Sequence, residues 1–101
     1  MYKLRFVQEI KKEQQDRFLE IEKKFVALEE NDPTMPRGRR YLPVMGKEPT
    51  NTFIWEAEYE TLEEAMRMLE AIESNDTHTA LLTEQVGCMA RTWTELYKSF
   101  S

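Results

Sequence analysis

The residues best suited to acid–base chemistry are one histidine and a glutamate on a strand-like segment. His78 is the only histidine in the chain, and an imidazole titrates near neutral pH, as a general base must. The alternative for His78 is a solvated ring in the first turn of a helix. No cysteine or carboxylate stands at metal-ligand spacing from it, so we expect no metal. The candidates for catalysis are Glu56 and His78.

Charged residues alternate along two predicted strands. Glu56 and Glu58 share one face of their strand, and Lys3 and Arg5 share a face of the first strand. Carboxylates in an enclosed space would have altered pKa values suited to proton abstraction. The alternative is that the lysine and arginine pair with the glutamates across strands and serve the structure.

The only basic cluster comprises Arg37, Arg39 and Arg40. An arginine fork suits a carboxylate or a phosphate, although such a loop can equally be solvated or lie in an interface. The strand aromatics suit packing under helices or in a dimer interface better than base stacking, because their neighbours are acidic. We list the candidate ligand-binding residues as Arg5, Arg40, Glu56, Glu58, Trp93 and Tyr97.

Changes in hydrophobic period predict the elements that carry these residues. Alternation predicts strands and a spacing of three to four predicts helices, while Pro33 and Pro36 end the first helix. Thr61 matches a capping box with Glu64, and Asp76 is the expected cap of a short third helix. We expect strands at 1–10, 39–45, 52–60 and 91–100, and helices at 11–30, 62–73 and 77–86.

This order of elements predicts one α+β domain over residues 1–101 with a ferredoxin-like βαββαβ fold and an extra short helix before the last strand. Both long helices would cover one face of the sheet. The other face has no cover within the chain, and two such sheets can pack into a homodimeric α/β barrel.

Composition excludes several classes of protein. The net charge of −5 argues against a nucleic-acid partner, and no apolar run approaches the length of a membrane span. The single cysteine, Cys88, cannot form an internal disulfide, which fits a reducing cytoplasm. Three glycines provide no phosphate-binding loop, so we expect no nucleotide and no other cofactor.

The run GRRYLPVMGKEPTNTFIWEAEYETLEEAMRMLEAI resembles the central segment of small NIPSNAP-like proteins of the dimeric α/β-barrel superfamily. The matching features are Arg40-Tyr41, Gly46, Asn51 with Trp55-Glu56, and Thr61-Leu62. The closing RTWTELYKSF is similar to the last strand of that family. The resemblance implies a homodimer in which two ferredoxin-like sheets pack face to face.

The same superfamily includes cofactor-free quinone-forming monooxygenases and haem-degrading enzymes, so the resemblance leaves activity open. The haem-degrading relatives use an asparagine on the first strand, a tryptophan, and a histidine near the second long helix. His78 lies in the corresponding region, but residues 1–10 contain no asparagine and Trp55 lies within a strand. These departures speak against haem.

The sequence therefore predicts a cytoplasmic homodimer that binds a small organic molecule between sheet and helices. One alternative is a cofactor-independent monooxygenase or isomerase acting on an aromatic or electron-rich molecule. In that enzyme Glu56 or His78 would take the proton and an arginine would stabilise the oxyanion. A second alternative is a non-catalytic dimeric scaffold for a protein partner.

Overall fold

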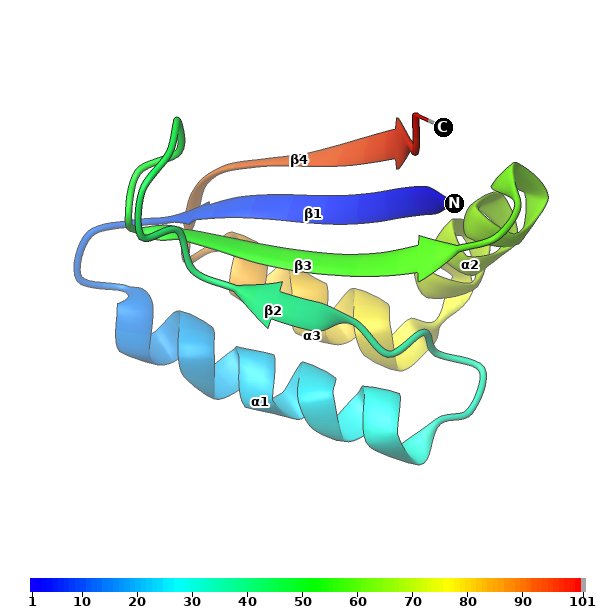
Figure 1. The fold of residues 1–101 in the computed structure, drawn as a ribbon. Helices are drawn as coiled ribbons and strands as arrows, with labels where there is room; N and C mark the ends of the chain where they lie inside the picture. The colour runs from blue at the N-terminus through cyan, green and yellow to red at the C-terminus, as the bar shows by residue number, and fades with distance from the viewer. Residues whose placement is uncertain (101) are drawn as a thin grey trace.

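The computed structural model describes residues 1–100 and contains four strands and three helices. The elements are β1 Tyr2–Ile10, α1 Gln15–Asn31, β2 Arg39–Tyr41, β3 Thr52–Tyr59, α2 Leu62–Ser74, α3 Asp76–Val86 and β4 Met89–Lys98. The strands form one antiparallel sheet in the order β2-β3-β1-β4, with the helices on one face (Figure 1). The predicted ferredoxin-like α+β fold, with its extra short helix, is confirmed.

The alternation of β1 sets the two faces of the sheet. Leu4, Phe6 and Gln8 point toward the helices, because each pairs with a β3 residue that also does, and Ile10 packs in the core beneath the sheet. Phe6 stands opposite Trp55 and stacks on its ring at 5.0 Å. The residues between them lie on the opposite side, which we call the open face. This assignment agrees with the sequence-based faces of both strands.

The core under the sheet divides into two clusters. The first joins α1 to the ends of β1 and β3 through Ile10, Phe18, Ile21, Phe25, Phe53, Cys88 and Met89. The second joins α2 to the other half of the same strands through Leu4, Trp55, Tyr59, Ala65 and Ile72. Phe6 and Gln8 of β1 lie between the two clusters, and this division leaves space beneath them.

The N-terminal cap of one helix was predicted correctly from the sequence, and that of another was not. Thr61 caps α2 as predicted, because its hydroxyl oxygen accepts from the Glu64 backbone N–H at 3.1 Å. The cap of α3 is Asn75 rather than Asp76: the Asn75 side-chain oxygen accepts from the His78 backbone N–H at 2.8 Å. The predicted start of the first helix at Lys11 is also wrong, since a turn with Glu13 at φ 70° precedes Gln15.

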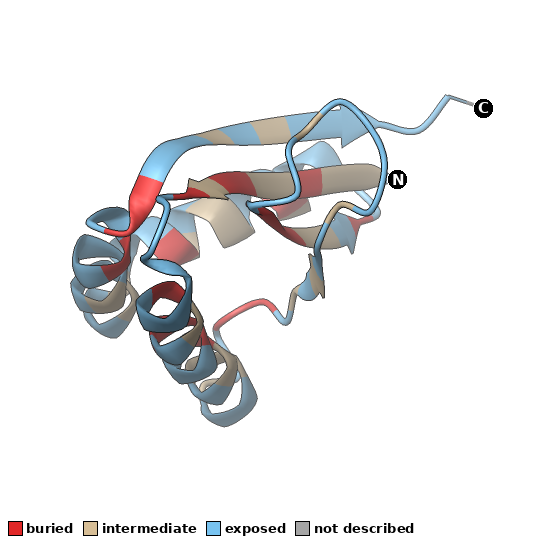
Figure 2. Cartoon of the chain, turned by 90° about the vertical axis from the view of Figure 1, so that its left-hand side faces the viewer, coloured by how far each residue is buried: buried red, intermediate tan, exposed pale blue. Residues whose placement is uncertain are grey.

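The second strand is much shorter than predicted. It ends at Tyr41, two residues before Pro43, which has no N–H to donate to a ladder. Residues 42–51 form a loop that reaches the height of β4 (Figures 1 and 2). Its tip leaves Val44 and Met45 93% and 94% exposed. The hydrogen bond that Arg91 donates to Glu9 raises the pKa of Arg91, and the charge of Glu48 in this loop adds a smaller effect in the same direction.

The last strand begins at Met89, two residues earlier than predicted, with a bulge where it leaves Ile10 of β1. Cys88, just before it, is buried and free. Within residues 1–100, no helix combines the length and the apolar character needed to cross a membrane.

Candidate functional site

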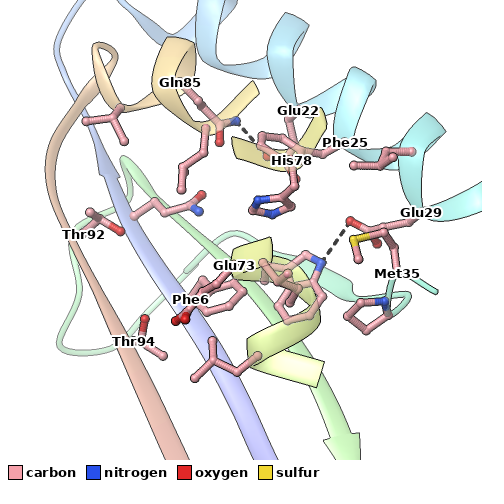
Figure 3. Close-up of a pocket in the computed structure, with 18 of the residues that line it drawn as sticks. Phe6, Glu22, Phe25, Glu29, Met35, Glu73, His78, Gln85, Thr92 and Thr94 are labelled. Carbon is pink, nitrogen blue, oxygen red and sulfur yellow. Dashed lines mark hydrogen bonds between the residues drawn. The ribbon is translucent and has the colours of Figure 1, made fainter. Parts of the chain in front are cut away.

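A cavity of about 300 Å³ lies between the sheet and the helices, in the gap between the two core clusters (Figure 3). All three helices and the strands contribute to its lining. The apolar part of the wall consists of Phe6, Phe25, Leu28, Met35, Pro36, Trp55, Leu69, Ile72, Leu82 and Val86. Leu82 and Val86 of α3 are 37% and 46% exposed, which places the mouth of the cavity along this helix.

One side of the cavity holds a charged cluster made of Glu22 and Glu29 from α1 and Arg40 from β2. The Arg40 Nε donates to Glu22 Oε2 at 2.6 Å, and its two terminal nitrogens donate to the carboxylate of Glu29. Burial alone would lower the pKa of Arg40, but the hydrogen bonds to Glu29 and Glu22 raise it. This fork holds the helix to the edge strand.

Neutral donors complete the coordination of both carboxylates. The Trp55 indole N–H donates to Glu29 at 3.3 Å and the Gly38 backbone N–H at 2.9 Å. The Gln85 amide donates to Glu22 at 2.8 Å (Figure 3). Gly38 approaches Trp55 so closely that a Cβ at this position would lie 1.9 Å from the indole ring. The charges of the cluster are therefore satisfied within the protein.

A second polar set faces the cavity without such satisfaction. Gln8 is 8% exposed, and within residues 1–100 its Oε1 has no hydrogen-bond partner. Opposite Gln8 across the β1–β4 pair stands Thr92, and opposite Phe6 stands Thr94; both threonines line the cavity. A buried polar group without a partner is rare in a folded protein, and the side chain that carries this one lines the cavity.

His78 is the third polar group in the lining. Figure 3 shows its ring pointing into the cavity from α3, and the ring packs on Phe25 with centroids 4.8 Å apart. Burial lowers the pKa of His78, and the charge of Glu29 opposes this only in part. The imidazole is therefore neutral at pH 7 and presents one donor and one acceptor.

The structure separates the predicted site residues into two groups. Arg40, His78 and Trp93 line the cavity. Trp93 borders the cavity through its position in β4 and not with its indole ring, because the indole N–H donates to Glu95 on the open face at 2.9 Å. Arg5, Glu56, Glu58 and Tyr97 do not line it, because their register places them on the open face.

The open face carries an ion-pair network. Lys3 and Arg5 lie 3.6 Å and 3.2 Å from Glu56, and Arg5 lies 3.4 Å from Glu95. The Arg5 guanidinium also lies over the Tyr97 ring at 5.6 Å. The cross-strand pairing that the sequence offered as the structural alternative is therefore present.

Glu95 is held in the ionised form by its neighbours on this face. Hydrogen bonds from Trp93 and Tyr97 lower its pKa, with a smaller contribution from Arg5. Glu56 and Glu58 also line a second hollow of about 320 Å³ beside Arg37 and Arg39. It lies at the edge of the sheet, away from the cavity.

Gln8, Glu22 and Glu29 were not predicted from the sequence as site residues. The signal was available for two of them: Gln8 is the one amide on the apolar side of β1, and Glu22 follows Phe18 and Ile21 at a buried helical position. Glu29 carried no comparable signal. Within the described residues, no three His, Cys, Asp or Glu side chains converge as metal ligands would.

The fold defines the class of protein to which this chain is similar. A NIPSNAP family protein from Agrobacterium tumefaciens superposes with a TM-score of 0.77 at 9% identity, covering 98% of this chain and 85% of that one. A NIPSNAP domain protein from Burkholderia xenovorans gives 0.74 at 13% identity over 100% and 96% of the two chains. The resemblance inferred from the sequence is confirmed at the level of the fold.

A third solved structure extends the comparison to enzymes. A protein described as an antibiotic biosynthesis monooxygenase superposes with a TM-score of 0.75 at 15% identity over the full length of both chains. No family model matches the sequence, and no curated protein matches it. The chain thus has the ferredoxin-like fold that NIPSNAP proteins share with this monooxygenase.

Proposed function

We propose that the protein binds a small organic molecule in the cavity between its sheet and its helices. The observation that carries the proposal is a cavity of about 300 Å³ whose wall includes Gln8, a residue only 8% exposed whose amide oxygen is buried without a partner. Apolar walls with a few convergent polar groups are the usual character of ligand sites. Here the convergent groups are Gln8, His78 and Thr92.

The test begins with native mass spectrometry of the purified protein without added ligand. A reproducible extra mass that disappears in the double variant Q8L/H78F supports the proposal, since both substitutions keep the approximate volume and remove hydrogen-bonding groups. K3M/E58L on the open face is the control and should retain the extra mass. The proposal fails if wild-type protein binds nothing from a panel of small aromatic compounds.

We further propose that the protein assembles as a cytoplasmic homodimer through the open face. Val7 and Ile54 lie on this face, flanked by Trp93 and Tyr41, their partners across the strands. The charged residues there balance, with four basic and four acidic side chains: Lys3, Arg5, Arg39, Arg91, Glu9, Glu56, Glu58 and Glu95. A second copy would therefore meet no net repulsion.

Sedimentation velocity tests the assembly. A species of twice the chain mass that dissociates in Y41D supports the dimer, because Tyr41 is 45% exposed in a single copy and a carboxylate there would become buried only in the interface. The matched control is L62D at the first residue of α2, which is 44% exposed and should leave the dimer intact. A monomer at all concentrations would overturn the dimer and the candidate role of Arg5, Glu56, Glu58 and Tyr97 as walls between two copies.

An enzymatic role is the second candidate. A neutral imidazole in an apolar cavity can take a proton from a phenol or an activated C–H, which is the step expected of a cofactor-independent monooxygenase or isomerase. His78 is the residue for this role in the cavity, since Glu56 lies on the open face and Arg40 is held by two carboxylates. Turnover that H78N abolishes while binding persists would support catalysis. Binding without turnover would identify a binding protein. If the protein neither binds nor converts a small molecule, the non-catalytic scaffold is the remaining candidate.

A further inference from the structure

We propose that the molecule taken up by the cavity is an organic cation, with a compact apolar body and a protonated amine. The inference rests on the proposed function, because it specifies the chemistry of a ligand in that cavity. It comes from the charges and the hydrogen-bonding groups that line the wall.

The charge of the lining is negative. The lining contains three carboxylates, those of Glu22, Glu29 and Glu73, and one guanidinium, that of Arg40. Their formal charges sum to −2. His78 adds no positive charge at pH 7, because burial lowers its pKa. In a partly enclosed site such a field repels anions and attracts cations more strongly than it would in bulk water.

Arg40 cannot compensate by receiving an anionic ligand. Its Nε and both terminal nitrogens already donate to Glu22 and Glu29. An incoming carboxylate or phosphate would have to displace one of these glutamates, and a displaced glutamate would remain as an unpaired buried charge. The single arginine of the cavity therefore works against anion binding.

The accessible polar groups of the wall match the donors of an ammonium. Gln8 Oε1 has no donor within the described part of the chain, but it is buried from solvent, so the acceptors open to a ligand come from its neighbours. A neutral His78 provides one acceptor nitrogen, and the Thr92 and Thr94 hydroxyls can each accept. An ammonium is donor-only, so it can satisfy several acceptors at once.

The apolar walls suit the body of the same molecule. The stacked rings of Phe6 and Trp55 form one wall, and the ring of Phe25 lies on another. Aromatic faces attract a cation through their quadrupole, with a strength that rises when water is excluded. The walls thus contribute to binding both the apolar body and the charge.

Glu73 is the carboxylate that can pair with the ligand directly. Unlike Glu22 and Glu29, it takes part in none of the ion pairs found within residues 1–100. It is exposed at the last turn of α2, and Figure 3 shows it extending from the helix toward the strands. Glu73 lies at the exposed rim of the cavity together with Thr92 and Thr94, so an ammonium there can pair with it without displacing a partner within the described residues.

The test compares three probes that share a naphthalene body: 2-naphthylmethylamine, 2-naphthalenemethanol and 2-naphthoate. The readout is the indole N–H resonance of Trp55, which lines the cavity, with the indole of Trp93, bonded to Glu95, as an internal control. We expect the amine to bind about three- to fivefold more tightly than the alcohol, as one exposed ion pair allows. We expect the naphthoate to bind at least about tenfold more weakly than the alcohol.

Two variants separate the charge of Glu73 from general effects. E73Q should bring the amine to within about twofold of the alcohol and leave the affinity for the alcohol unchanged. E70Q removes a charge one turn earlier on α2, at a residue that does not line the cavity, and should change neither affinity by as much as twofold.

The outcomes distinguish this inference from the proposed function. If the alcohol or the naphthoate shifts Trp55 and binds more tightly than the amine, the cavity is a ligand site and the cation proposal is overturned. If the amine leads but E73Q and E70Q act alike, the assignment to Glu73 is overturned. If none of the probes shifts Trp55, the proposed function fails and this inference fails with it.

Discussion

Replacing Arg40 with methionine should destabilise the fold far more than replacing an exposed arginine. The substitution keeps most of the side-chain volume but removes the one cation between Glu22 and Glu29. The three side chains are 19%, 9% and 12% exposed, respectively, so both carboxylates would remain in a largely buried place without a counter-charge. Removing one member of a buried ion pair costs about 3–5 kcal/mol.

The partial exposure of Arg40 favours the lower end of that range, about 3 kcal/mol. For a domain of this size such a loss lowers the melting temperature by more than about 10 °C. The measurement is urea denaturation followed by tryptophan fluorescence. R17M is the matched control, because Arg17 pairs with Glu84 at 3.7 Å with both side chains about half exposed; it should cost less than about 1 kcal/mol.

A second substitution tests the cause of the loss. Adding E29Q to R40M removes one stranded charge, so the double variant should recover part of the stability that R40M loses. The reasoning is refuted if R40M costs no more than R17M. It is also refuted if E29Q in the R40M background adds a further loss as large as its loss in the wild type.

Three further outcomes are expected. T61A removes the hydroxyl that caps α2 and should lower the free energy of unfolding by about 1 kcal/mol; an unchanged urea midpoint would contradict the role of the cap. G38A places a Cβ against the Trp55 ring and should cost at least about 2 kcal/mol, whereas G87A, whose Cβ would have its nearest neighbour at 3.4 Å, should cost less than about 1 kcal/mol. An NMR titration should give His78 a pKa below 6.5. Because the unfolded state then binds more protons than the folded state, the free energy of unfolding should fall as pH drops through 6.5. A pKa above 6.5 would contradict the burial of the ring.

The sequence predicted the fold because each element carries its own periodic pattern. Thr61 and Glu64 marked the start of α2, and alternation placed Glu56 and Glu58 on one side of β3. The errors lie where local signals compete. Asn75 and Asp76 are both good caps and adjacent in sequence, so only the packed helix selects one of them.

The residues that line the cavity were predicted less well, because alternation separates the two faces of a sheet without indicating which one borders a cavity. Arg5 and Glu56 drew attention as charges on a strand, yet on the open face they neutralise one another. Arg40 was selected as a ligand-binding arginine, but helix α1 brings Glu22 and Glu29 to it. That contact joins residues separated by 18 and 11 positions along the chain, a distance that no local pattern reports.

The pairing of β1 with β4 determines when the cavity is completed during folding. Tyr2 pairs with Lys98 and Gln8 with Thr92, so this ladder joins residues far apart in sequence and forms slowly relative to local contacts. Thr92 and Thr94 of β4 line the cavity opposite Gln8 and Phe6. An intermediate that has α1, β3 and α2 in place but lacks β4 therefore has an open trough beside β1 instead of a cavity. Under the proposed function, a ligand would therefore be held only after the last strand docks, and it would stabilise the completed sheet rather than speed its formation.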